Sequence, residues 1–155
     1  SMCLLHLLLN EYQHTYSKLT CIHINHGLRQ ASIEEEAFFK TYCEEHGIEY
    51  YIKRLDLSET VEAGNSIQNI SRQYRYEWFD YIMKQLGASV LLTAHHRDDQ
   101  IETIFYRLFT GRFTRSHLGI AYTSQRVSYQ LVRPMLDFSK ATIKSYQNQY
   151  LNLLI

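Results

Sequence analysis

Residues 93–103 read Thr-Ala-His-His-Arg-Asp-Asp-Gln-Ile-Glu-Thr, and they hold two histidines and three carboxylates within positions 95–102. The apolar run 90–92 precedes them, and apolar residues at helical spacing follow them, at Ile101, Ile104, Phe105 and Leu108. This order predicts a strand, a polar turn and a helix that begins in the turn. Open α/β sheets bind ligands where strands end, and helix N-termini attract phosphate. Carboxylates in such a turn are suited to hold Mg²⁺ against a phosphate.

Helix capping explains part of this pattern. Asp98 and Asp99 are favourable at a helix N-terminus, and the spacing of Asp99 and Glu102 is that of a capping box. Capping does not explain His95 and His96, because two adjacent strand residues face opposite sides and do not share one core. We therefore favour a functional site at this turn, with capping as a second role of the same carboxylates.

A second polar cluster ends another predicted strand, where residues 23–29 read His-Ile-Asn-His-Gly-Leu-Arg. His23 is open to a simpler interpretation as a half-buried strand residue. His26 and Arg29 lie beyond the strand, and parallel strands would bring them to the same sheet edge as His95. The sequence is compatible here with a functional site and equally with an ordinary strand end.

A third cluster lies in the predicted helix 66–86. Arg72 and Arg75 are three positions apart, so they occupy neighbouring places on one helix face. Charges on a helix usually mark a solvated face. A pair of arginines on one face would also suit a phosphate clamp.

Helices and strands alternate along the chain, which predicts an α/β fold with a mostly parallel sheet and helices on both faces. Gly47 and Gly87 stand where the C-terminal caps of two helices belong. The stretch 110–126 lacks periodicity and is a candidate mobile basic loop. The predicted helices are 2–13, 34–45, 66–86, 99–109 and 139–146, and the predicted strands are 20–25, 49–55, 89–94 and 129–132.

The composition limits the class of protein. A length of 155 residues suits a single domain over 1–155, and the balance of 16 basic and 16 acidic residues gives no overall signal for nucleic acid. The three cysteines stand far apart without a Cys-x-x-Cys pair, which indicates a reducing, cytoplasmic setting. No apolar run reaches membrane-spanning length, so we expect no membrane association.

Taken in order, these clusters resemble tRNA(Ile)-lysidine synthetase, a family of the N-type ATP-pyrophosphatase group. The matching segments are 22–29, 65–76 and 93–103, and residues 133–136, Arg-Pro-Met-Leu, resemble an Arg-Pro-Leu-Leu stretch of the family. The string Thr-Ala-His-His-x-Asp-Asp-Gln-x-Glu-Thr is the most specific of these. The resemblance implies an adenine-nucleotide α-hydrolase-like, Rossmann-like fold.

The resemblance also implies a chemistry. ATP, with Mg²⁺, adenylates the C2 oxygen of the wobble cytidine in tRNA(Ile) and releases pyrophosphate. The ε-amine of free L-lysine then attacks C2 and expels AMP. Such a site must neutralise the phosphates, hold an unstacked cytidine in line with the α-phosphate, and accept a proton from the amine.

Residue by residue, the resemblance assigns the turn to catalysis and metal binding. Asp99 matches an aspartate for metal or amine handling, and His95 matches the histidine beside it. Asp98 and Asp99 are the implied Mg²⁺ ligands. Asp98 and Glu102 are weaker candidates than Asp99, because capping alone accounts for Glu102.

The implied nucleotide-binding residues lie elsewhere in the chain. Arg72 matches a helix arginine that meets the nucleotide phosphates, and His26 and Arg29 match a loop near the nucleotide. The family begins its site with Ser-Gly-Gly-x-Asp-Ser, which this sequence lacks. Ser1 stands where the final serine of that motif would be; alternatively, it is a cloning scar before Met2.

The missing loop leads to further expectations. We expect a truncated catalytic domain without C-terminal tRNA-recognition domains, less stable than the complete domain and without ATP turnover of its own. The sequence leaves open whether the protein forms a homodimer. It also leaves open three rival functions. The first is a related tRNA thiolase, which Cys3, Cys21 and Cys43 do not favour because they are unpaired. The second is a phosphoesterase with a metal on residues 95–99, and the third is an inert fragment.

Overall fold

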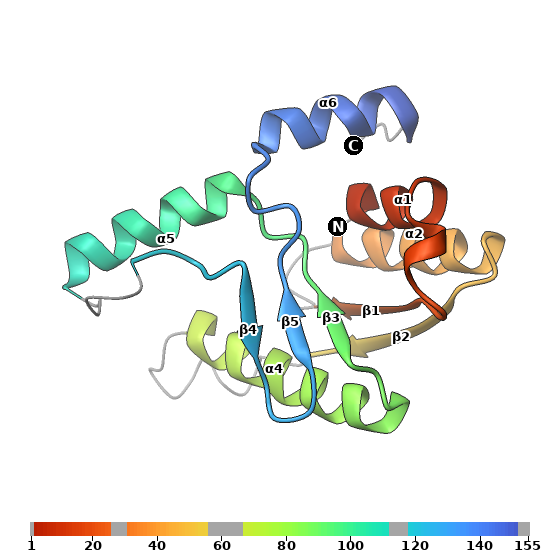
Figure 1. The fold of residues 1–155 in the computed structure, drawn as a ribbon, viewed down its shortest axis with the longest axis horizontal. Helices are drawn as coiled ribbons and strands as arrows, with labels where there is room; N and C mark the ends of the chain where they lie inside the picture. Colours follow the sequence, from red (N-terminus) through yellow and green to blue (C-terminus); the bar gives the residue numbers. More distant parts are fainter. Residues whose placement is uncertain (1, 26–30, 56–66, 112–117, 152–155) are drawn as a thin grey trace. The chain divides into compact units, whose positions relative to one another are not determined.

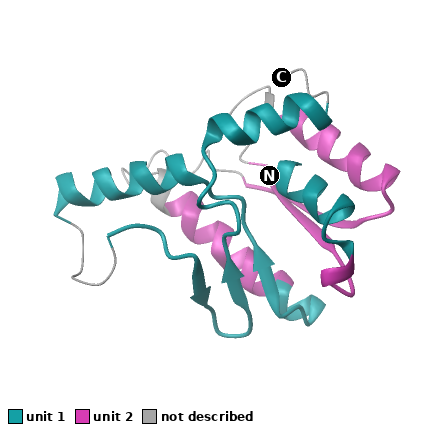
Figure 2. Ribbon diagram, turned by 45° about the horizontal axis from the view of Figure 1, so that its top comes forward, with its two compact units in different colours: residues 1–13, 83–155 teal, residues 14–82 magenta. Residues whose placement is uncertain are grey.

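The computed structural model describes residues 2–25, 31–55, 67–111 and 118–151. Ser1, His26 and Arg29 lie outside the described residues, as do residues 112–117 of the predicted basic loop. The chain divides into two compact units, one of residues 1–13 and 83–155 and the other of residues 14–82, coloured separately in Figure 2. The single-domain assignment over 1–155 stays a prediction.

The unit of residues 14–82 is built on a parallel strand pair. Strands β1 (Thr20–Asn25) and β2 (Glu49–Arg54) run in the same direction, joined by helix α2 (Ala31–Glu45), as Figure 1 shows. Helix α4 (Ile67–Leu86) continues from this unit into the other. Gly47 ends α2 with φ of +62°, a left-handed conformation that glycine adopts without strain, so its predicted capping role is confirmed.

Aromatic side chains hold α2 on the strand pair. Phe39 is buried, stacks on His23 at a centroid distance of 5.0 Å, and meets Tyr50 edge-on at 5.9 Å. Cys43, one turn further along α2, is fully buried. His23 is therefore a packing residue whose pKa burial lowers, which confirms the simpler of its two interpretations.

A buried polar network ties α2 to the carboxyl ends of both strands. Asn25 donates from Nδ2 to the Glu36 carboxylate at 2.6 Å and to the main-chain oxygen of Ser32 at 3.1 Å. Arg54, opposite Asn25 in the strand register, donates to the same carboxylate from Nη2 at 2.6 Å and from Nε at 3.1 Å. These bonds lower the pKa of Glu36 from 4.5 to about 2.

Glu36→Gln is expected to destabilise the protein at neutral pH by about 1–2 kcal/mol. This is less than the full pKa shift of Glu36 would imply, because solvent screens the exposed Arg54. The folded-state pKa of Glu36 lies below its unfolded value, so this stabilisation is complete above about pH 4.5 and is lost as the pH falls toward about 2. Urea unfolding should therefore separate wild type from variant at pH 7 and not at pH 2. Glu35→Gln, on the exposed face of the same helix, is the control; an equal effect there would contradict the assignment to this network.

The other unit holds a three-stranded sheet in the order β3-β5-β4. Strand β3 (Val90–Leu92) pairs with β5 (Gln130–Val132) in parallel, and β4 (Thr123–Gln125) pairs with β5 in antiparallel fashion (Figure 1). Leu131 in the central strand is buried, as is Tyr129 just before it. Helix α5 (Arg97–Thr110) follows β3, and helices α1 (Met2–Asn10) and α6 (Lys140–Tyr150) pack together through His6 and Tyr146, whose Nδ1 and hydroxyl lie 2.9 Å apart.

The predicted elements are confirmed with shifted ends. Strand β3 is shorter than predicted and helix α5 begins at Arg97, before the predicted start at Asp99. Ser139 caps α6 by accepting from the Thr142 amide, as predicted, but α6 continues to Tyr150. Strand β4 was missed inside the stretch 110–126, because the short edge strand Thr-Ser-Gln carries no alternation of apolar residues.

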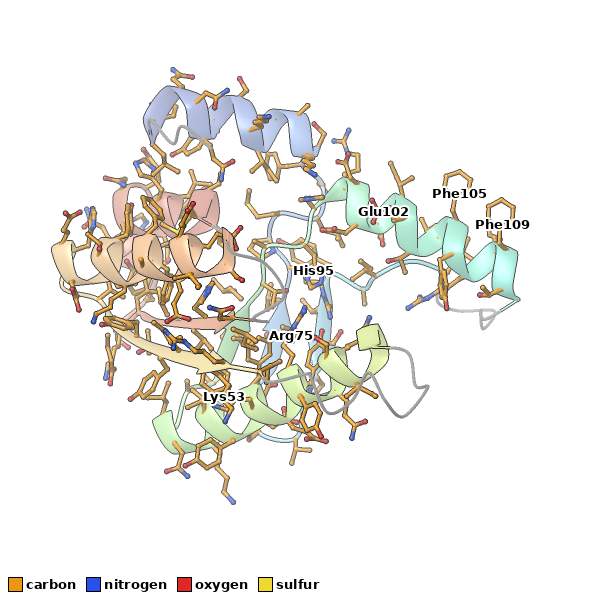
Figure 3. All side chains as sticks on the ribbon, turned by 180° about the vertical axis from the view of Figure 1, so that it is seen from behind. Lys53, Arg75, His95, Glu102, Phe105 and Phe109 are labelled. Carbon is orange, nitrogen blue, oxygen red and sulfur yellow. The ribbon has the colours of Figure 1, made fainter. Side chains whose placement is uncertain are left out.

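The apolar pattern of α5 predicts a helix correctly but not a buried face. Ile101, Phe105, Leu108 and Phe109, here called the α5 apolar stripe, are 46%, 54%, 47% and 85% exposed. The rings of Phe105 and Phe109 stack with centroids 6.2 Å apart and stand away from the helix in Figure 3. Nothing else in the described residues of this chain covers the stripe, so the periodicity records a surface rather than a core.

Candidate functional site

The predicted turn follows directly from β3, which pairs in parallel with the central strand β5. The Thr93 amide still donates to the Val132 carbonyl at 3.0 Å, which extends the sheet pairing one residue past β3. The chain then turns, and the Thr93 hydroxyl lies 2.9 Å from Nδ1 of His95. This bond fixes one ring nitrogen of His95 and thereby the orientation of the imidazole. His95 and His96 both lie beyond the strand and are half-buried.

His96 and Asp99 form the capping box that opens α5. The Asp99 amide donates to Nδ1 of His96 at 3.4 Å, and the His96 amide donates to Oδ2 of Asp99 at 2.8 Å. The predicted box of Asp99 and Glu102 is therefore wrong, because the helix begins two residues earlier and Asp99 occupies the third helical position. The sequence pattern did not indicate this box, because histidine is an unusual N-cap residue.

Asp98 connects the starts of two helices. Its Oδ2 accepts a hydrogen bond of 2.7 Å from the Lys140 amide, in the first turn of α6. Beside it, the Arg97 amide donates to the Phe138 carbonyl at 2.9 Å, and the Arg97 guanidinium donates to the Asp137 carbonyl. These bonds hold the turn against the segment that leads into α6. The charge of the Asp98 carboxylate is favourable there, because the N-terminus of a helix attracts negative charge.

Glu102 is left without a structural role in the cap. It is exposed on the first turns of α5 (Figure 3), and its carboxylate has no hydrogen bond or ion pair in the described part of the chain. It lies four residues after Asp98 and three after Asp99, so the three carboxylates share neighbouring positions on one helix. Capping, which weakened the case for Glu102 in the sequence, no longer accounts for it.

Gln100 fixes the far side of the turn. Its side-chain amide donates to the Ile120 carbonyl at 3.1 Å and accepts from the Ile120 amide. A side chain at Gly119 would displace the Gln100 side chain from this position, since a Cβ atom would come within 2.6 Å of the Gln100 side-chain oxygen. This glutamine therefore has a positioning role that the sequence did not reveal.

The carboxylates of the turn suit a magnesium ion that is shared with phosphate. Asp98 and Asp99 each use Oδ2 in capping, while Oδ1 of each has no partner among the described residues. Mg²⁺ in phosphoryl sites takes one or two protein carboxylates and completes its shell with phosphate and water. A site made by protein alone is not indicated, because the described residues contain no group of three or more metal-binding side chains.

The other predicted site residues lie elsewhere. Arg72 is exposed in α4, within the unit of residues 14–82, and its guanidinium carbon lies 5.7 Å from the centroid of the Tyr76 ring. Its convergence with the His95–Asp99 turn stays a prediction. The nucleotide-binding roles of Ser1, His26 and Arg29 also stay predictions, since these residues are not among those described.

Two parallel strand pairs, with a polar turn between β3 and α5, are typical of an α/β domain of the nucleotide-binding class. The whole chain is similar to a solved U34-tRNA thiolase, NcsA from Methanococcus maripaludis with its [4Fe-4S] cluster. The TM-score is 0.74 at 17% identity, over 98% of this chain and 54% of that one. This likeness shows the fold, and the predicted adenine-nucleotide α-hydrolase-like architecture is confirmed.

The chain belongs to the PP-loop domain family, which matches residues 1–152. It is 63% identical, over 147 residues, to the tRNA(Ile)-lysidine synthase of Staphylococcus epidermidis, and 57% identical, over 150 residues, to that of Staphylococcus aureus. These alignments cover 95% and 97% of this chain and 34% and 35% of the relatives. The chain thus spans about a third of the length of these relatives, and the resemblance predicted from the motifs is confirmed.

The chemistry of the cysteines does not favour the thiolase alternative. All three cysteines are free, and burial together with the neighbouring Cys43 raises the pKa of Cys21 to about 12. Burial also raises the pKa of Cys3 and Cys43. Sulfur transfer and cluster binding both need thiolates, which these environments oppose.

The phosphoesterase alternative fares no better. It needs His95, His96, Asp98 and Asp99 to converge on one metal ion, yet the described residues contain no group of three or more metal-binding side chains. Among the described segments, no helix is both long enough and apolar enough to cross a bilayer.

Proposed function

We propose that the protein containing this chain ligates L-lysine to C2 of the wobble cytidine of tRNA(Ile), using ATP and releasing AMP and pyrophosphate. The observation that carries this proposal is the 63% identity, over 95% of the chain, to a relative named tRNA(Ile)-lysidine synthase. The carboxylate oxygens that have no partner among the described residues, at the end of a parallel strand, support it, because that edge is where such sheets bind nucleotides.

In this proposal the turn after β3 handles charge and protons. Asp98 and Asp99 would hold Mg²⁺, which neutralises phosphate charge as pyrophosphate leaves. His95, oriented by Thr93, would face the reacting cytidine. Glu102, exposed and without a partner in the described structure, is suited to accept the proton that the lysine amine must lose before it attacks.

The phosphates of ATP require cations from other parts of the chain. Arg72 presents an exposed guanidinium on α4 and would contact the triphosphate, together with His26, Arg29 and Ser1. Arginine suits this task because its planar fork of N–H donors matches phosphate oxygens.

The proposed reaction is tested by incubating the intact protein with ATP, Mg²⁺, isotope-labelled lysine and a tRNA(Ile) transcript. Nuclease digestion and mass spectrometry should detect lysidine in an amount equal to the AMP released. A transcript with uridine at the wobble position is the matched control and should yield neither product. Incorporation of sulfur, or AMP release without lysine incorporation, would overturn the proposal.

A cytoplasmic homodimer completes the proposal. The cytoplasm is supported by the free cysteines and by a tRNA substrate. The dimer is supported by the α5 apolar stripe, since soluble monomers rarely leave a contiguous apolar surface uncovered and a second copy of this chain would bury it.

Phe109→Glu is expected to raise the dissociation constant of the dimer by roughly tenfold or more, because a charge would enter an apolar interface. Sedimentation velocity over a range of concentrations measures this. Phe109 is 85% exposed, so the fold itself should be unaffected. Val127→Glu, at an exposed position between β4 and β5, should leave the dimer unchanged. A wild-type protein that stays monomeric throughout would refute the dimer.

A further inference from the structure

The carboxyl end of the β1–β2 pair carries an arginine, Arg54, whose orientation is fixed by more deeply buried side chains. The Arg54 side chain is 74% exposed, whereas the Glu36 side chain that holds it is only 12% exposed. Glu36 is in turn fixed by Asn25, which is itself buried. The order of contacts, from buried amide to buried carboxylate to exposed guanidinium, runs outward from the core to the surface.

The Arg54 guanidinium has N–H donors that no described residue uses. Its Nε and one N–H of Nη2 bond to the Glu36 carboxylate. A guanidinium has five N–H donors, so about three are left, and they have no acceptor in the described residues. The bidentate contact with Glu36 fixes the plane of the guanidinium, and the remaining N–H donors lie in that plane. Coplanar N–H donors match the oxygen atoms of a phosphate.

The location of Arg54 distinguishes it from an ordinary surface ion pair. Arg54 is the last residue of β2, and parallel strands bind ligands beyond their carboxyl ends. An exposed ion pair contributes little to stability and needs no support from the core. The carboxylate that holds Arg54 is buried and is itself held by a second buried side chain, so this pair differs from an ordinary surface ion pair. Fixing the rotamer of a ligand-binding side chain does require such a support.

We propose that Arg54 binds a phosphate group beyond the carboxyl ends of β1 and β2, and that Glu36 is the positioning residue that orients it. The proposal deepens the proposed function, because that function supplies two sources of phosphate, the nucleotide and the RNA backbone. Glu36 neutralises much of the Arg54 charge, so binding depends on the directed N–H donors more than on net charge.

The test compares variants of the intact protein in two binding assays. Isothermal titration calorimetry with the Mg²⁺ complex of α,β-methylene-ATP, without RNA, reports the nucleotide phosphates. Filter binding of a tRNA(Ile) transcript over a salt series, without nucleotide, reports the RNA backbone. Arg54→Gln should weaken one of them by roughly tenfold or more. If it is the RNA, the slope of log K against log salt should also become less steep, by less than one unit, because Glu36 neutralises much of the Arg54 charge.

Two further variants separate orientation from charge. Arg54→Lys keeps the charge and loses the fork, so it should fail to restore the affinity, whereas full restoration would overturn the positioning role of Glu36. Lys53→Gln removes a charge at the neighbouring exposed position, on the opposite side of the strand, and should change both affinities less than twofold. Arg54→Gln affinities within twofold of wild type in both assays, or an equal loss in Lys53→Gln, would overturn the phosphate site.

Glu36→Gln distinguishes a positioning role from a merely structural one. It should weaken the same ligand as Arg54→Gln and leave the other unchanged, whereas general unfolding would weaken both. Lysidine formation by the wild-type protein is measured in the same preparations. A wild type that binds both ligands but forms no lysidine would refute the proposed reaction, while the two binding assays would still decide the role of Arg54.

Discussion

Asp99→Asn is expected to reduce AMP release in the presence of tRNA and lysine by about a thousandfold. Metal binding and proton handling by a carboxylate both require its negative charge, and loss of such a group costs about 10²–10⁴ in rate. The asparagine side-chain oxygen can still accept the hydrogen bond that the His96 amide gives to Asp99. Single-turnover measurement of AMP, with saturating ATP, separates this loss from weaker substrate binding.

The structure decides which substitution makes this test informative. Asp99→Ala would also remove the capping box, which costs about 1 kcal/mol, so reduced activity would mix unfolding with lost chemistry. Asp137→Asn is the matched control, because Asp137 lies beside the same turn and only its main-chain oxygen is used there. Unchanged turnover in Asp99→Asn would remove Asp99 from the catalytic site.

Arg72→Ala is expected to raise the KM for ATP by roughly tenfold to a hundredfold and the KM for lysine less than twofold. A charge-assisted contact with a phosphate contributes about 1.5–3 kcal/mol, and lysine offers no phosphate. Arg72 is exposed, and its guanidinium lies over the Tyr76 ring, so stability should fall by about 1 kcal/mol at most. Steady-state kinetics with each substrate varied in turn gives both constants.

Two variants define the role of Arg72 further. Lys84→Ala removes an exposed cation from the last turn of the same helix and should leave both constants unchanged. Arg72→Lys should recover part of the ATP affinity, because a lysine contacts phosphate as a point charge without the planar fork. Equal changes in the constants for ATP and lysine would exclude Arg72 from the phosphate site.

Much of the fold was predictable because local patterns agree with it. Apolar runs before polar turns located the strands β1, β2, β3 and β5 to within two residues at either end. Gly47 and Gly87 mark helix ends because both have positive φ, which glycine adopts freely. Strand β4 escaped prediction because it is held by its pairing with β5, a contact between segments rather than a property of three polar residues.

The candidate site was predictable in composition but not in its contacts. Asp99 appeared in the sequence as the start of a capping box, and in the structure it completes one with His96. That difference frees Glu102 for chemistry. The Arg54–Glu36 pair was invisible in the sequence because its members are 18 residues apart and meet only when α2 packs on the strands.

The amino-acid sequence by itself determined the alternation of helices and strands, the position of the polar turn and the resemblance to one family of PP-loop proteins. These follow from local spacing, since residue periodicity and helix-terminating glycines act over a few neighbours. The tertiary structure alone decided which polar groups are already engaged and which are left for a ligand. That distinction depends on contacts between distant segments, such as Asp98 with α6 and Arg54 with α2, which burial and hydrogen bonding fix only in the folded chain.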